Sequence, residues 1–280
     1  MNRTLAGAVA LVGTLMLPAV IHAQGRCTRA DLQKAVDSYL AARAAGKPAN
    51  LRRAATLKYV ENMSPAAIDK GILATPLTID FHRSLLDTDA CETFTEAIVT
   101  DKRHPYVLGV RLKLTGNALS EIEAMVTDKD DWLFNADNYL KYSSTEDWSV
   151  IPQSARDTRQ TILAAGNAYE DVFKDNSVKV PWGTPCNRLE GGAHSGKGAP
   201  DDSCNVGVPS GMDLHDRRAV VDPEIGAVVI FSRFPNEIPD THLFRIEKGK
   251  IRFVHTLTVC LLPNCGFPVR NAPATPPASR

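Results

Sequence analysis

Apolar residues recur at spacings of three and four in two segments of the chain. The first segment follows Thr28, which can cap a helix, and stops at Gly46. The second begins after Pro152. Because this spacing puts apolar side chains on one helix face, we predict an amphipathic helix at the start of each half. The two predicted stripes are Leu32, Ala35, Val36, Tyr39 and Leu40, and Ile162, Ala165, Tyr169, Val172 and Phe173.

Each predicted helix is followed by runs rich in β-branched residues, in which polar and apolar positions alternate. Such runs are typical of strands with one buried face. Lys248, Gly249 and Lys250 separate the last two runs and predict a hairpin turn. A helix and a meander that bury their apolar faces together predict an α+β fold, with a curved sheet that encloses a pocket. The predicted strands are residues 93–100, 106–114, 119–127, 219–222, 227–234, 242–247 and 251–259.

Similar or ionisable residues recur about 130 positions apart through most of the chain. We interpret this recurrence as an internal duplication. The first lobe would occupy residues 24–150 and the second residues 151–262, followed by a disordered tail at 263–280. The matched pairs are Tyr39 and Tyr169, Glu61 and Glu190, Asp80 and Asp213, His82 and His215, and Glu123 and His255.

Residues 1–23 have the features of a signal peptide. Arg3 supplies the positive start, residues 5–21 are apolar, and Ala23 is a small residue suited to cleavage. No later segment reaches the roughly 18 consecutive apolar residues of a membrane span. We therefore predict a soluble protein that is secreted or periplasmic and has no membrane contact after cleavage.

The charge of the chain is balanced, with 32 basic and 32 acidic residues. The basic residues form no cluster, which argues against nucleic acid or an anionic membrane as the main partner. A small neutral or amphipathic molecule fits this composition better.

Six cysteines follow the predicted cleavage site, and an even number favours disulfides in an oxidising compartment. None of them has the C-x-x-C spacing of a redox motif or a zinc site. Sequence separation favours three particular bridges among the possible connectivities. These are Cys186 with Cys204, Cys260 with Cys265, and Cys27 with Cys91.

The order of a helix, a polar strand and hairpins that end in a Lys-Ile-Arg-Phe-Val-His-Thr strand resembles the NTF2-like (SnoaL-like) fold. Two such units in one chain would mimic the dimer that is common in this fold, and a homodimer of the whole chain stays possible.

A second resemblance covers nearly the whole mature chain, and it is carried by residues 79–84, 131–135, 180–186, 188–192 and 254–256. These segments look like a family of secreted fungal and bacterial proteins. The family includes extracellular, glutathione-independent enzymes that cleave β-aryl ether bonds of lignin-derived compounds. The resemblance implies a small aromatic substrate.

Familiar catalytic motifs fail on their context. Gly191 to Lys197 has the spacing of a phosphate loop, but Gly198 replaces the Ser or Thr and Pro200 prevents the helix that should follow. The chain has no G-x-S-x-G elbow and no H-E-x-x-H helix, so serine and zinc hydrolases of those types are not indicated.

An Asp-x-His pattern occurs three times, and the strand period of two would put both side chains on one face. A carboxylate beside an imidazole fixes its tautomer and raises its basicity. The pattern is open to three interpretations: a structural ion pair, an acid–base pair or a metal site. The pairs are Asp80 with His82, Asp213 with His215, and Asp240 with His242.

His255 interrupts an otherwise apolar strand face, so we expect it to point into the interior of the second lobe. It could be a core histidine with a hydrogen-bond partner. The matched site in the first lobe is Glu123, which is also ionisable. A pocket at this depth in both lobes would explain the burial of both groups.

Glu61 and Glu190 are the other matched acidic sites, near the loop that should cover each cone. Arg188 accompanies Glu190, and Trp182 could form a stacking wall for an aromatic ligand or simply plug a turn. Both glutamates could also be ordinary surface residues. Arg217 and Arg245 could hold an oxyanion, or they could pair with acidic residues.

Cleavage of an alkyl aryl ether expels a phenoxide, which needs only an acid of modest strength and an activated water. We therefore predict catalysis by Glu190 and His255, supported by His242 and Arg188, with neither metal nor cofactor. The competing site in the first lobe is Glu61, Asp80, His82 and Glu123. The rival function is a binding protein that sequesters a small aromatic or apolar molecule without turnover.

Overall fold

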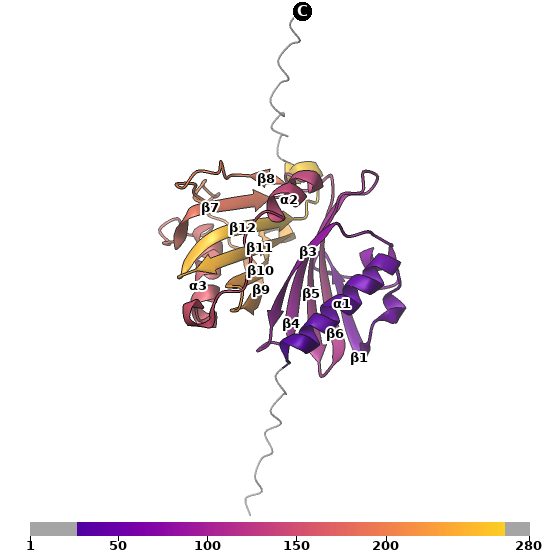
Figure 1. Cartoon of the computed structure of the whole chain (residues 1–280). Helices are drawn as coiled ribbons and strands as arrows, with labels where there is room; N and C mark the ends of the chain where they lie inside the picture. Colours follow the sequence, from indigo (N-terminus) through magenta and orange to yellow (C-terminus); the bar gives the residue numbers. More distant parts are fainter. Residues whose placement is uncertain (1–26, 267–280) are drawn as a thin grey trace, which may run out of the picture.

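The computed structural model describes residues 27–266 and contains two lobes, each with a helix and a six-stranded sheet. The predicted signal peptide and most of the predicted tail lie outside the described residues. In the first lobe, helix α1 (Arg29–Ala45) precedes a sheet with the order β2-β1-β6-β5-β4-β3. In the second lobe, α3 (Arg159–Val172) precedes a sheet with the order β8-β7-β12-β11-β10-β9. Helix α2 (Ala136–Ser143) lies between the lobes (Figure 1).

The first sheet contains β1 (Arg53–Glu61), β2 (Ser64–Pro65), β3 (Phe81–Asp87), β4 (Glu92–Val99), β5 (Tyr106–Thr115) and β6 (Ala118–Thr127). The second contains β7 (Trp182–Glu190), β8 (Ala193–His194), β9 (His215–Asp222), β10 (Ala227–Phe234), β11 (Ile238–Glu247) and β12 (Lys250–Thr258). Short 3₁₀ turns occur at η1 (Pro48–Asn50), η2 (Ile72–Ala74), η3 (Gln153–Ala155), η4 (Pro235–Glu237) and η5 (Pro263–Gly266).

Local sequence signals account for the helix ends. Thr28 and Asp31 form a capping box at the start of α1, and Gly46 ends it with a left-handed φ of 61°. The second helix begins at Arg159 under the Thr158 cap, several residues after Pro152. The predicted α+β class and the hairpin before Lys250 are confirmed.

The two sheets repeat one topology, since each is antiparallel except for one parallel pair. Equivalent positions also share the same strand register. Glu123 pairs with Val60 across β6 and β1, and His255 pairs with Leu189 across β12 and β7. The matched positions that the sequence predicted for Glu123 and His255 are therefore equivalent in register.

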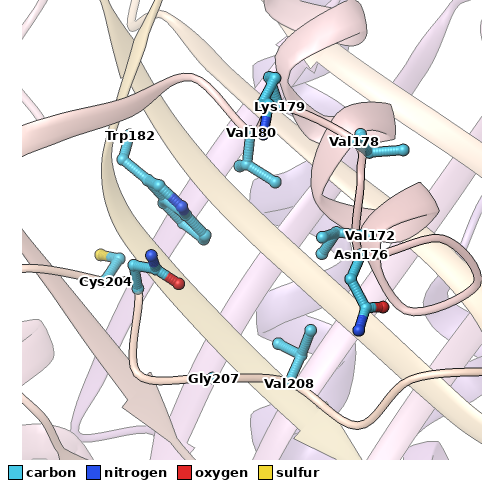
Figure 2. A pocket seen from close by; sticks show the side chains of 10 residues that line it. Val172, Asn176, Val178, Lys179, Val180, Trp182, Cys204, Gly207 and Val208 are labelled. Carbon is cyan, nitrogen blue, oxygen red and sulfur yellow. The ribbon is translucent and has the colours of Figure 1, made fainter.

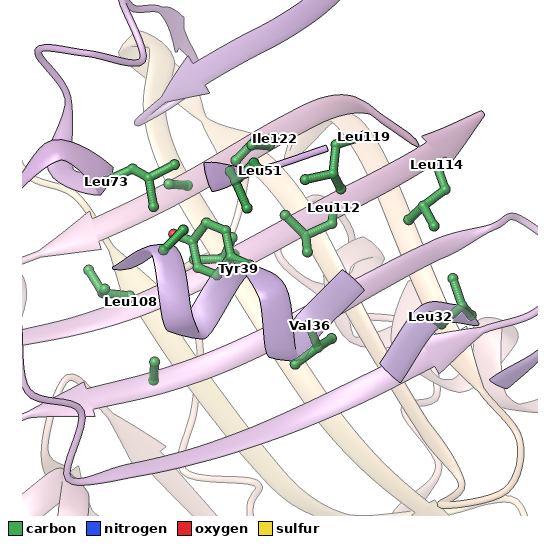
Figure 3. Close-up of a cluster of buried hydrophobic side chains, with 14 of the residues drawn as sticks. Leu32, Val36, Tyr39, Leu51, Leu73, Leu108, Leu112, Leu114, Leu119 and Ile122 are labelled. Carbon is green, nitrogen blue, oxygen red and sulfur yellow. The ribbon is translucent and has the colours of Figure 1, made fainter. Parts of the chain in front are cut away.

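The lobes are layered, with α1 and α3 on the outer faces and the two sheets facing each other (Figure 1). Tyr39 lies in the core between α1 and the first sheet (Figure 3). A separate apolar cluster joins the two sheets and includes Phe94 and Phe231, whose ring centroids are 5.9 Å apart. Each sheet is therefore buried on both faces.

Two reciprocal ion pairs join the lobes. Arg29, at the start of α1, bonds to Asp222 of the second lobe, with Nη1 2.8 Å from Oδ1. Arg159, at the start of α3, bonds to Asp87 of the first lobe at 2.6 Å. Both carboxylates are fully buried, and each also accepts a backbone N–H from the other lobe. The interface thus has the self-complementary form of a two-fold dimer interface.

All three predicted disulfides are present: Cys27–Cys91, Cys186–Cys204 and Cys260–Cys265. They indicate an oxidising compartment outside the cytoplasm. The Cys260–Cys265 bridge links η5 to the segment that follows β12. The backbone N–H of Asn264 in η5 donates to the carbonyl of Asp130. The predicted tail therefore starts too early, because residues 263–266 are folded onto the protein. Among residues 27–266, no helix combines the length and the apolar character that a membrane crossing needs.

Candidate functional site

A group of polar side chains lies between α3 and the face of the second sheet that α3 covers. Strand alternation puts Ser232, Asp240, His242 and Thr256 on this face, because Ser232 pairs with Asp240 and His242 pairs with Thr256 across neighbouring strands. Two residues of α3 and two of β7 complete it. We call this set the second-lobe polar cluster: Tyr169, Glu170, Arg188, Glu190, Ser232, Asp240, His242 and Thr256.

His242 is 1% exposed and meets two carboxylates through one ring nitrogen. Its Nδ1 lies 2.8 Å from Oε1 of Glu170 and 2.9 Å from Oδ2 of Asp240. Burial disfavours the protonated ring, but the charges of Asp240 and Glu170 outweigh burial and raise the pKa of His242 to about 10. His242 is therefore an imidazolium at neutral pH. Because both carboxylates meet Nδ1, Nε2 is the nitrogen that can face a bound molecule.

Several buried atoms of the cluster have no hydrogen-bond partner within residues 27–266. Such groups cost about 1–3 kcal/mol each, and native structures normally pair them with protein, water or ligand. Their concentration here marks a place where a small polar group can bind. In the described part of the chain, no three His, Cys, Asp or Glu side chains are arranged to hold a metal ion. The unpaired atoms are Tyr169 Oη, Glu170 Oε2, Arg188 Nε, Ser232 Oγ and Thr256 Oγ1.

The first lobe shows that the fold does not require these polar residues. At the positions equivalent to Asp240 and His242 it has Leu108 and Val110, which are fully buried in an apolar core. Leu40 takes the place of Glu170, since each directly follows the helix tyrosine that the two lobes share, Tyr39 in the first and Tyr169 in the second. Ala97 and Ala124 replace the two hydroxyl residues. Because one topology is stable with an apolar filling, the charged filling of the second lobe indicates a function.

Arg188 and Glu190 lie on the edge of the cluster nearest the interlobe segment. The two side chains form an ion pair of 3.3 Å, and the Arg188 guanidinium lies over the Tyr169 ring at 5.6 Å. Trp132 donates from Nε1 to Oε1 of Glu190 at 3.2 Å. Glu190 is 26% exposed, so it is the member of the cluster that can most readily exchange with water.

A pocket of about 260 Å³ opens beside the cluster, between the end of α3, the start of β7 and residues 204–208. Figure 2 shows Trp182 facing Val172 and Val208 across this pocket. Tyr169, a member of the cluster, contacts both Trp182 and His242, because its ring is 5.8 Å from that of Trp182 and 4.8 Å from that of His242. Trp182 therefore gives the pocket an aromatic wall, and Tyr169 connects this wall to the imidazolium.

His255 does not lie in this interior, which corrects the prediction that it faces Glu190 across a cavity. It points to the interface between the lobes, where Nδ1 is 2.9 Å from Glu96 and Nε2 is 2.6 Å from Glu146. Glu123 also points to the interface and bonds to Arg218 of the second lobe. Contact between the two lobes, rather than a pocket, therefore buries His255 and Glu123.

The contacts of His255 with Glu96 and Glu146 predict that the protein is most stable in mildly acidic solution. Burial opposes its charge, but Glu146 and Glu96 raise the pKa of His255 to about 9. Burial opposes the charge of Glu96 as well, but His255 and Arg83 lower its pKa to about 2. The stability from His255 is complete below pH 6.5 and lost as the pH rises to about 9. The stability from Glu96 is complete above pH 4.5 and lost as the pH falls to about 2.

We therefore expect the free energy of unfolding to fall by about 2 kcal/mol or more between roughly pH 6 and pH 9. Urea denaturation at both pH values measures it. His242 contributes with the same sign, so His255→Gln should remove about half of the fall and the double variant with His242→Gln should remove nearly all of it. An unchanged fall in the double variant would show that other groups cause it.

The remaining predicted site residues lie outside the cluster. Asp80 and Asp213 precede their strands, so only Asp240 and His242 form an Asp-x-His pair on one strand face. Asp80 accepts from Thr100, and His82 is exposed. Other residues have structural partners: Glu61 accepts from the Tyr59 hydroxyl, Arg217 pairs with Asp171, and Arg245 donates to the carbonyls of Ser149 and Ile225.

Glu170 is the main residue of the cluster that the sequence prediction missed. It lies eight residues after Ile162 and four after Gly166, on the buried face of α3. A charged residue at a position of the apolar stripe was the available signal, since burial of a charge requires a partner. Tyr169 fits the apolar stripe of the predicted helix, so its spacing gives no sign that its hydroxyl belongs to a polar cluster.

A family described as a domain of unknown function (DUF8021) matches part of the chain. It covers residues 155–258, which extend from just before α3 to the end of β12. The matched segment contains every member of the second-lobe polar cluster and none of the first lobe. No curated protein matches the chain.

Proposed function

We propose that the second lobe binds a small aromatic molecule and cleaves an aryl ether bond in it by acid–base hydrolysis. The observation that carries the proposal is the charged cluster around His242, which replaces an apolar core at equivalent positions of the first lobe. The resemblance to the secreted β-aryl etherases supports the choice of substrate. The helix and curved mixed sheet of each lobe support assignment to the NTF2-like fold, and export to the periplasm or the medium belongs to the same proposal.

His242 is suited to be the acid. Burial lowers its pKa, but Asp240 and Glu170 raise it above that of a free imidazole, so His242 carries a proton that the departing aryl oxygen can take. Glu170 and Asp240 hold Nδ1, so Nε2 donates the proton. The imidazolium is formed before the substrate binds, because the carboxylates are already in place.

Glu190 is suited to be the base. It lies in the same row of the sheet as His242, with Thr256 between them. Two strand spacings separate the backbones by about 10 Å, which leaves room for an ether bond and a water molecule between the two side chains. Water attacks the carbon and gives its proton to Glu190, the carbon–oxygen bond breaks, and the aryl oxygen takes the proton of His242. The products are an alcohol and a phenol, and no electrons are exchanged with a cofactor.

One observation favours the alternative, a binding protein without turnover. The Tyr169 ring contacts both Trp182, which lines the pocket, and His242, which is only 1% exposed and does not line it. A ligand could stack in the pocket without reaching the imidazolium. Catalysis requires Tyr169 to rotate and admit the ether oxygen.

We expect the purified protein to release a phenol from a β-O-4 aryl ether dimer without glutathione, added metal or nicotinamide. The released phenol, counted per protein molecule over time, measures turnover. Release well beyond one equivalent supports the enzyme. Saturable binding of the dimer by calorimetry with no phenol released would establish the binding protein instead, and the absence of both would contradict the proposal.

A further inference from the structure

The first lobe encloses a guanidinium that forms no direct ion pair with a carboxylate of the described residues. Arg43 lies in the last turn of α1 and is fully buried. Its Nη1 donates to the backbone carbonyls of Ile72, at 2.5 Å, and Thr75. These two bonds fix the orientation of the group, but carbonyls carry no charge to balance it.

Arg43 is exceptional among the buried arginines of the described chain. Burial of an unpaired charge is costly, so such residues are normally paired. Within residues 27–266, no carboxylate oxygen lies within ion-pair distance of Arg43. Burial lowers the pKa of Arg43, and the nearby charge of Glu61 acts against this, but the Glu61 carboxylate accepts from the Tyr59 hydroxyl and the Ile72 N–H rather than from Arg43. The other four buried arginines each have a carboxylate partner: Arg83 with Glu96, Arg111 with Glu92, Arg188 with Glu190, and Arg245 with Glu247.

The unpaired donors of Arg43 have a particular shape. Its Nε and Nη2 are both buried without a hydrogen-bond partner in the described residues. These two nitrogens form one edge of the planar group, and their parallel N–H bonds match the two oxygens of a carboxylate. Tyr39 precedes Arg43 by one helical turn, and its buried hydroxyl is also unpaired. The three donors share one region of the lobe interior.

We infer that the first lobe binds a small monocarboxylate, held by the Nε–Nη2 edge of Arg43 and by the Tyr39 hydroxyl. The planar pair of carboxylate oxygens satisfies both nitrogens, and a single negative charge is favoured because Glu61 already lies nearby. The residue equivalent to Arg43 in the second lobe is Phe173, so the site belongs to the first lobe alone. The η2 turn, which supplies the Ile72 carbonyl, covers it.

Thermal unfolding of the mature protein in increasing sodium acetate tests this site, with sodium chloride added to keep the ionic strength constant. We expect acetate to raise the Tm progressively, because it binds only the folded state. Acetamide, a neutral molecule of the same shape, should not. Arg43→Met and Arg43→Lys should lose at least ten-fold in acetate affinity, since neither offers the bidentate edge.

Lys47→Met is the matched control, because it removes one positive charge from an exposed position near the same helix end. It should respond to acetate as the wild type does. Tyr39→Phe keeps the packing of the helix and should bind acetate several-fold more weakly, so it decides the matter if the Arg43 variants do not fold. Equal stabilisation by acetamide, an unchanged response in Arg43→Lys and Tyr39→Phe, or no response of the wild type would overturn the inference.

Discussion

Replacing His242 by Gln is expected to lower turnover of an aryl ether by about 10²-fold or more. Glutamine keeps a polar group of similar reach but carries no transferable proton at neutral pH. Binding should change less, because the Trp182 pocket is unaffected. Initial rates of phenol release at saturating substrate measure the effect.

His255→Gln is the matched control, since His255 is equally buried and also contacts two carboxylates. It should lower the Tm through loss of the interface bonds while the folded fraction keeps its rate. The melting temperature of both variants must be measured alongside the rate. Full activity of His242→Gln together with loss of activity in His255→Gln would move the chemistry to the lobe interface.

Removal of either interlobe carboxylate is expected to destabilise the whole protein. Asp222→Ala removes the buried acceptor of the Leu86 N–H and the bidentate partner of Arg29, which keeps only the longer contact to Glu224 at 3.3 Å, at a cost of about 3 kcal/mol. Asp87→Ala should have a similar effect, because it deprives Arg159 and the Val221 N–H of the same kind of acceptor. Denaturation midpoints and slopes in urea give the free energies.

Asp213→Ala provides the comparison. Asp213 pairs with Lys174 at 2.9 Å, but both side chains are exposed, so this surface ion pair should contribute little. A loss in Asp222→Ala no greater than that in Asp213→Ala would show that the reciprocal pairs do not hold the lobes together.

The sequence was sufficient for the repeat, the opening helices, most hairpins and all three disulfides. These features depend on local periodicity, on caps such as Thr28 and on the separation of cysteines. Strand β1 was not predicted, because its first six residues are exposed or partly exposed and show no clean alternation. Helix α2 was missed because its eight residues are too few to establish a period.

The sequence could not decide whether a charged strand residue faces the lobe interior under the helix or the interface between the lobes. Alternation separates the two faces, but here each sheet is covered by a helix on one face and by the other sheet on the opposite one. Both faces are therefore apolar with occasional charges, and His255 and His242 look alike in sequence. The reciprocal partners Arg29 and Asp222 are 193 residues apart, so only the assembled interface brings them together.

The joining of two units in one chain lets their interiors differ. In a symmetrical homodimer every substitution occurs twice, so a set of buried charges would reduce the stability of both halves. Here Leu108 and Val110 keep an apolar core in one lobe, while Asp240 and His242 occupy the same positions in the other. The two lobes can thus bury different polar groups, Arg43 in the first and His242 in the second, without either group occurring twice. Because the two lobes are covalently linked, this asymmetry does not depend on protein concentration, an advantage for a protein outside the cytoplasm.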